Sequence, residues 1–240
     1  MFVENLTYIR GVGKTGSPSF MHTAELYSDL PVQAFQTQAI DMDQLVEHGY
    51  VIVPNFLASA QCSIIFDYAR ELPAGAWQQA GIGRADQYTT NTAVRQDKIR
   101  WLSPALAVER DYLQMMEHLR ELINRELFMG LFDYECHLAH YPPGSFYRKH
   151  LDAFKGRSNR ILTTVFYLNP EWQATDGGEL VIYGDHGEVL ETVLPQAGKL
   201  VLFLSDRFVH EVLPGQRDRF SITGWYRLNA SIGGVIDPTR

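Results

Sequence analysis

"RILTTVFYLN", residues 160–169, belongs to a run of short apolar segments that decides the fold. The other segments of the run are "FDYECHLAHY" (132–141), "ELVIYG" (179–184), "EVLETVLP" (188–195), "KLVLFLS" (199–205), "RFVHEVLP" (207–214) and "RFSITGWYRL" (219–228). Turn signals such as "TDGG", "DHG" and "QAG" separate the later segments, and no helical pattern intervenes. Short strands joined by turns predict an antiparallel sandwich or barrel of about seven or eight strands. In "FDYECHLAHY", alternation places Phe132, Tyr134, Cys136 and Leu138 on one face.

The residues before this run predict helices. A short helix and a strand at Tyr50–Val53 come first, followed by helical spacing in 59–72 and in 103–127. We expect Ser59 to cap the first of these two helices, and Ser103 and Pro104 to begin the second. Helices followed by strands predict an α+β fold, a double-stranded β-helix (jelly roll) core with N-terminal supporting helices. We expect an irregular extension at 1–38, a single domain at 39–230 and a C-terminal tail at 231–240.

Composition argues against several classes of protein. The formal net charge is -7, whereas proteins that coat nucleic acid or anionic membranes normally present a basic surface. Two cysteines argue against a disulfide framework and against a zinc site built from thiolates. No apolar run reaches about 18 residues, and the N-terminus lacks a secretory pattern. We therefore expect a cytoplasmic protein that binds neither nucleic acid nor membranes.

The stretch "YRKHLDAFKGRSNR" (147–160) contains a candidate for half of a metal site. On an extended strand, residues i and i+2 point the same way, so His150 and Asp152 would present an imidazole and a carboxylate to one point. Taken alone, the pattern more often marks an ordinary polar bend, because a single His-x-Asp occurs often by chance. A third ligand would complete a 2-His-1-carboxylate facial triad, the arrangement typical of non-haem Fe(II) oxygenases. His210, in "DRFVHEVLP", is the best candidate because a closed roll would bring it beside the pair.

Other histidines compete for this role. His137 and His140 lie on the preceding strand and could face inward. His186 and Glu188 form a rival His-x-Glu in "GDHGE", but residues of such a turn usually face solvent.

Arg219 opens the last long strand, and Ser221, Thr223 and Trp225 share its face. An arginine that points into a barrel is costly unless it meets an anion, and its planar guanidinium fits a carboxylate with two parallel hydrogen bonds. A dicarboxylate could therefore reach from a metal to Arg219. A surface arginine paired with an acidic side chain is the alternative.

Seven segments carry a resemblance to a known family: "HGYVIVPNFL" (48–57), "DKIRWL" (97–102), "YPPGSFYRKHLD" (141–152), "YLNPEW" (167–172), "DGGELVIY" (176–183), "FLSDRFVHEV" (203–212) and "RFSITGWY" (219–226). Together they resemble the 2-oxoglutarate- and Fe(II)-dependent dioxygenases. The resemblance is greatest to the prolyl 4-hydroxylase branch, specifically the hypoxia-inducible-factor type and its bacterial relatives, and it spans roughly residues 42 to 228.

The resemblance implies a role for each candidate residue. Fe(II) would be bound by His150, Asp152 and His210. The 2-oxoglutarate site would contain Arg219, Tyr141, Tyr167 and Thr223, with Arg219 and Tyr167 on the distal carboxylate. The substrate side would contain Tyr147, Arg160 and Trp225. The polar loop from Gly81 to Lys98 would be a lid that closes over bound peptide.

The resemblance also implies the reaction. It would be hydroxylation of C4 of a prolyl residue in a protein, with 2-oxoglutarate and O2 consumed and succinate and CO2 released. Ascorbate would serve as reductant, and the bacterial relatives suggest a translation factor as acceptor. The alternative is hydroxylation of a free amino acid or small metabolite with the same cofactors. We expect a proline-containing peptide as partner and a monomeric enzyme. The departures from the animal enzymes, at "AFKGRS" (153–158) and in the C-terminal tail, both concern substrate choice.

Overall fold

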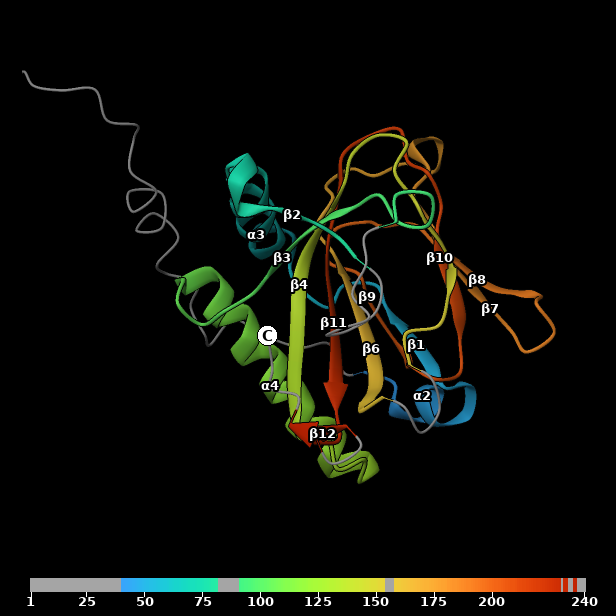
Figure 1. The fold of residues 1–240 in the computed structure, drawn as a ribbon. Helices are drawn as coiled ribbons and strands as arrows, with labels where there is room; N and C mark the ends of the chain where they lie inside the picture. The colour runs from blue at the N-terminus through green and yellow to red at the C-terminus, as the bar shows by residue number, and fades with distance from the viewer. Residues whose placement is uncertain (1–39, 82–90, 154–157, 230, 233–234, 237–240) are drawn as a thin grey trace, which may run out of the picture.

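The structure is a computed structural model that describes residues 40–81, 91–153, 158–229, 231–232 and 235–236 (Figure 1). The expected extension at 1–38 lies outside the described residues. So do residues 82–90 of the expected lid and residues 154–157 of "AFKGRS".

Within the described part of the chain, three α-helices precede the main run of strands: α2 (Met42–His48), α3 (Ser59–Glu71) and α4 (Ala107–Leu127). Two 3-10 turns, η2 (Ala74–Ala76) and η4 (Ala174–Asp176), complete the described helical structure. Among the described residues, no helix combines the length and apolar character needed to cross a membrane.

Two of the expected helix starts are wrong. Ser59 is the first residue of α3, and the N-cap is Ala58, whose carbonyl accepts from the backbone N–H groups of Gln61 and Cys62. Helix α4 begins at Ala107 rather than at Ser103 and Pro104. The backbone N–H of Ser103 donates instead to the side chain of Glu109, and residues 104–106 form a turn and bend before the helix.

The strands form two main antiparallel sheets. The larger has the order β1-β9-β6-β11-β4-β3-β2, the smaller has the order β5-β10-β7-β8, and β12 pairs with β13. Their bounds are β1 (Tyr50–Val53), β2 (Gln78–Gln79), β3 (Lys98–Trp101), β4 (Asp133–Tyr141), β5 (Tyr147–His150), β6 (Arg160–Tyr167), β7 (Leu180–Tyr183), β8 (Val189–Val193), β9 (Leu200–Leu204), β10 (Val209–Val212), β11 (Arg219–Arg227), β12 (Ser231–Ile232) and β13 (Val235–Ile236). The expected α+β fold, a jelly-roll core with N-terminal helices, is confirmed.

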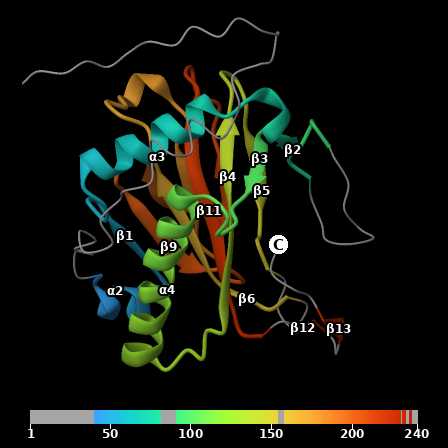
Figure 2. The same ribbon diagram turned by 90° about the vertical axis from the view of Figure 1, so that its left-hand side faces the viewer.

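Helices α3 and α4 cover one face of the larger sheet (Figure 2). Cys136 and Leu138 of β4 point to this side and belong to the same buried cluster as Tyr112 and Met116 of α4. Tyr134 packs against that cluster, as the alternation predicts. Phe132 is a correction: it is 58% exposed, because it precedes β4 and therefore lies outside the alternating segment.

The opposite face of the larger sheet packs against the smaller sheet and contains the site. A second buried cluster fills this space, with Ala139 and Tyr141 from β4 and Ile182 from β7. The strand register aligns inward-facing residues of β4, β11 and β6 in rows; one row is Glu135, Trp225 and Thr163. Each residue of such a row lies beside its neighbour across the sheet.

Candidate active site

His150 and His210 face each other across the paired strands β5 and β10, where they are direct register partners. Their ring centroids are 4.2 Å apart. Nδ1 of His150 lies 2.8 Å from the carbonyl of Arg148, and Nδ1 of His210 lies 3.0 Å from the carbonyl of Phe208. A carbonyl only accepts, so each Nδ1 carries the hydrogen and each Nε2 keeps its lone pair for a metal.

Asp152 completes the cluster, but not in the way the sequence suggested. Strand β5 ends at His150, and Asp152 lies in a bend beyond it, so the expectation of one shared strand is wrong. Its carboxylate is held from the larger sheet: Thr163 Oγ1 and Trp225 Nε1 donate to Oδ2 at 2.8 and 3.0 Å. Nε2 of His150 is 3.5 Å from Oδ1, and Nε2 of His210 is 3.8 Å from Oδ2.

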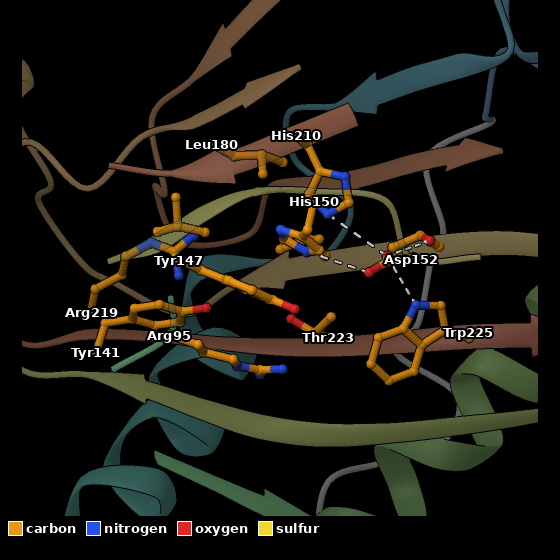
Figure 3. A pocket seen from close by; sticks show the side chains of 13 residues that line it. Arg95, Tyr141, Tyr147, His150, Asp152, Leu180, His210, Arg219, Thr223 and Trp225 are labelled. Carbon is orange, nitrogen blue, oxygen red and sulfur yellow. Dashed lines mark hydrogen bonds and ion pairs between the residues drawn. The ribbon is translucent and has the colours of Figure 1, made fainter. Parts of the chain in front are cut away.

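The candidate ligand atoms of His150, Asp152 and His210 all lie within 4.8 Å of one another (Figure 3). Burial opposes ionisation of Asp152, but the two imidazoles and the Trp225 hydrogen bond hold its pKa well below the usual range. Burial, with the nearby His150, lowers the pKa of His210 to about 4. One carboxylate oxygen and two imidazole nitrogens therefore converge at one point, which is the donor set of an Fe(II) facial triad.

Arg219 and Tyr141 lie at the other end of the same pocket (Figure 3). Arg219 is buried, and its Nε donates to the carbonyl of Gly178 at 2.9 Å. Its guanidinium carbon lies 4.8 Å from the ring centroid of Tyr141 and 5.1 Å from that of Tyr167. Nη2 of Arg219 and the hydroxyl of Tyr167 are buried without a hydrogen-bond partner among the described residues. Two unpaired donors at this end suit a carboxylate.

The pocket between these two ends contains about 440 Å³ of empty space, part of it open to solvent. Tyr147 stacks on His150, with centroids 3.5 Å apart and planes 15° apart, and the guanidinium carbon of Arg95 lies 4.5 Å from the ring centroid of Tyr147. Thr223 and Trp225 also line the pocket. The residues present fit both a metal and a dicarboxylate that would extend from it.

The competing histidines lie apart from this cluster. His137 is buried but packs against Trp101, with centroids 5.2 Å apart. His140 stacks on Phe220 and bonds through Nε2 to Asp218 at 2.7 Å. His186 is exposed in the turn between β7 and β8.

Arg160, expected on the substrate side, has partners within the protein. Its Nε and Nη2 lie 2.9 and 2.8 Å from Oε1 of Glu135, and its guanidinium carbon lies 3.4 Å from the ring centroid of Trp225. Its side chain is 14% exposed.

Three residues of this region, Thr163, Glu135 and Arg95, are not among those predicted from the sequence. Thr163 and Glu135 could have been found by counting back in steps of two from Tyr167 and Tyr141. Arg95 lines the pocket and forms two hydrogen bonds with Asp97, at 2.6 and 2.8 Å. It precedes β3 in an irregular segment, where no periodic pattern identifies it.

Comparison with known proteins agrees with this geometry. Residues 136–227 match the model of the family described as "2OG-Fe(II) oxygenase superfamily". The crystal structure of a prolyl-4-hydroxylase from Pseudomonas putida is 39% identical in sequence, with a TM-score of 0.70 and coverage of 78% of this chain and 96% of that one. The chain belongs to the prolyl hydroxylase branch of the 2OG-Fe(II) oxygenases.

Other members of the prolyl hydroxylase branch are similar over most of the chain. A Trichoplax adhaerens prolyl hydroxylase, solved with a hypoxia inducible factor peptide fragment, is 26% identical, with a TM-score of 0.69 and coverage of 86% and 91%. The Caenorhabditis elegans hypoxia-inducible factor prolyl hydroxylase is 45% identical over 199 residues, and human Egl nine homolog 1 is 29% identical over 189 residues. These alignments cover 76% and 75% of this chain, which spans only 27% and 44% of the two relatives.

Proposed function

We propose that this protein hydroxylates C4 of a prolyl residue in a protein substrate, consuming 2-oxoglutarate and O2 and giving succinate and CO2. One observation carries the proposal. The His150, Asp152 and His210 cluster shares a single pocket with the buried Arg219, whose Nη2 has no partner among the described residues. That pairing suits a co-substrate with a chelating group at one end and a carboxylate at the other.

Each side chain then has a stated task. His150, Asp152 and His210 would hold Fe(II), which with 2-oxoglutarate and O2 supplies the oxidising power for an unactivated C–H bond. Arg219 and Tyr167 would bind the distal carboxylate of 2-oxoglutarate. Tyr141 would pack beside it, as its position next to Arg219 supports. Thr163 and Trp225 would orient Asp152 so that one face of the metal stays open.

Tyr147 and Trp225 line the pocket and are assigned to the substrate side. Arg160, which contacts Glu135 and Trp225, stays a prediction for that side. The relatives support a proline-containing protein or peptide as the acceptor. The Trichoplax prolyl hydroxylase was solved in complex with a peptide fragment of a hypoxia inducible factor. An extended proline segment loses little freedom on binding, since the ring already fixes φ. The lid role of Gly81–Lys98, a translation factor as acceptor, ascorbate as reductant, a monomeric state and a cytoplasmic location stay predictions.

The test is acceptor-dependent turnover. Purified full-length protein is supplied with Fe(II), ascorbate and 2-oxoglutarate, and succinate is measured with proline-containing peptides or with free amino acids. Succinate formation that requires the peptide, together with one added oxygen on its proline, supports the proposal. Turnover with a free amino acid or metabolite, and none with peptides, would support the alternative instead. Mass spectrometry of proteins from cells with and without this gene would then identify the acceptor.

A further inference from the structure

Glu135, Arg160 and Arg227 form a network of charged side chains next to Trp225, which donates to Asp152. Glu135 is only 2% exposed, and removing a carboxylate from water in this way costs free energy. Its Oε1 accepts a hydrogen bond from Nε of Arg160 at 2.9 Å and forms an ion pair with Nη2 at 2.8 Å, and its Oε2 lies 3.7 Å from Nη1 of Arg227. Arg227 is fully buried and is separately held by Asp133. A buried ion pair is often no more stabilising than apolar residues of the same volume, so stability alone does not explain Glu135.

The strand register connects Glu135 to Asp152. Glu135, Trp225 and Thr163 are direct neighbours across β4, β11 and β6. Arg160 extends over this row, and its guanidinium carbon lies 3.4 Å from the ring centroid of Trp225. On the same indole, Nε1 donates to Asp152 Oδ2 at 3.0 Å. A fixed guanidinium against the ring limits the tilt of the indole and therefore the direction of its N–H.

We propose that Glu135 is a positioning residue of the metal site: it holds Arg160 against Trp225 and thereby fixes the indole N–H on Asp152. The inference rests on the proposed function, because it takes Asp152 as a metal ligand. Residues that orient ligands in this way typically change metal affinity by about 10- to 100-fold when they are replaced.

The experiment measures Mn(II) affinity of the purified full-length protein, from the electron paramagnetic resonance signal of free Mn(II). Glu135→Gln keeps the size of the side chain and removes its charge, and Trp225→Phe removes the N–H. We expect each to weaken Mn(II) binding about tenfold, and the double variant to bind no more weakly than Trp225→Phe alone, because both act through one hydrogen bond. Glu117→Gln is the control, since Glu117 pairs with Arg120 on α4 and not with the residues around Trp225, and it should bind Mn(II) as the unaltered protein does.

A second variant guards against a folding defect. Arg160→Met keeps a long apolar stem and removes the guanidinium, and it should weaken Mn(II) binding as Glu135→Gln does. Normal affinity in both Glu135→Gln and Arg160→Met overturns the inference, and so does a double variant whose losses add. Either result leaves the proposed function intact as long as His210→Ala abolishes binding. Absence of Mn(II) binding by the unaltered protein would overturn the proposed function and this inference with it.

Discussion

The guanidinium carbon of Arg219 lies 5.1 Å from the ring centroid of Tyr167, and each of these side chains buries one polar atom that has no partner among the described residues. Burying an unpaired hydrogen-bonding group costs free energy, so folded proteins rarely leave two of them side by side. A carboxylate placed between Nη2 and the hydroxyl would satisfy both. The pocket is therefore organised at this end for an anion that comes from outside the chain.

Arg219→Lys should weaken 2-oxoglutarate binding. A lysine keeps the charge but cannot make two parallel hydrogen bonds to a carboxylate. With about 1.5–3 kcal/mol for a charge-assisted bond, we expect KM for 2-oxoglutarate to rise about 10- to 100-fold, while Mn(II) affinity changes little. Arg217→Lys is the control, because Arg217 is 40% exposed and pairs with Asp176. Unchanged KM in Arg219→Lys would show that the carboxylate binds elsewhere.

Tyr167→Phe should separate stability from co-substrate binding. The change removes a buried hydroxyl that lacks a partner, so without 2-oxoglutarate the free energy of unfolding should stay equal or rise by up to about 1 kcal/mol. With saturating 2-oxoglutarate, the variant should gain less thermal stability than the unaltered protein, because one donor to the ligand is gone. Thermal unfolding with and without the ligand measures both effects. A large loss of stability in the free protein would indicate that the hydroxyl already has a structural partner.

His137 should make the fold sensitive to acid. Burial, with Arg95 nearby, lowers the pKa of His137 to about 3, whereas its ordinary value is 6.5. Below pH 6.5 the unfolded chain binds this proton and the folded protein does not, so the free energy of unfolding falls as pH falls, by about 1.4 kcal/mol per pH unit. His137→Met removes this contribution. The free energy of unfolding, measured with urea at several pH values between 7.5 and 5, should therefore change less with pH in that variant than in the unaltered protein.

The control for this pH effect is His186→Gln, a change at an exposed histidine in a turn. Its free energy of unfolding should change with pH in the same way as that of the unaltered protein. If the free energy of unfolding changed equally with pH in His137→Met and in the unaltered protein, His137 would take up its proton in the folded state as readily as in the unfolded one.

Glu109 should be a main support of the helical layer. It is 1% exposed and accepts hydrogen bonds from the hydroxyl of Tyr68 on α3, from Nε of Arg100 on β3 and from the backbone N–H of Ser103. Glu109→Gln leaves Arg100 without its counter-charge, and since Arg100 keeps some solvent access we expect a loss of about 2 kcal/mol in urea unfolding. Glu117 is 47% exposed and pairs with Arg120, so Glu117→Gln should lower the free energy of unfolding by less than about 1 kcal/mol. Equal losses in the two variants would contradict this account.

The sequence predicted the fold and the main metal candidates because both depend on local signals. Strand alternation and turn residues predicted the jelly roll, and the short His-x-Asp pattern drew attention to His150 and Asp152. The position of Asp152 could not be predicted, because it is not set by the strand that contains His150. Thr163 and Trp225, which belong to the other sheet, hold its carboxylate. The helix starts could not be predicted from local propensity either. The start at Ala107 depends on the Glu109 side chain, and the start at Ser59 depends on the carbonyl of Ala58.

The partners of Arg160 were also beyond the sequence. The resemblance implies a place on the substrate side, and that role stays a prediction. The register of β4, β11 and β6 aligns Arg160 with Arg227 and brings it to Glu135 and Trp225. A pairing between β4 and β6 through an intervening strand is a long-range relationship. Spacing along the chain carries no information about it.

The most direct test of the central claim compares the unaltered protein with Asp152→Ala in the peptide hydroxylation assay, with Asp185→Ala, an exposed acid in a turn, as control. We predict that the unaltered protein and Asp185→Ala release succinate in step with the addition of one oxygen to a peptide proline. We predict that Asp152→Ala does neither while remaining folded by circular dichroism. Proline hydroxylation that persists at the normal rate in Asp152→Ala would contradict the account.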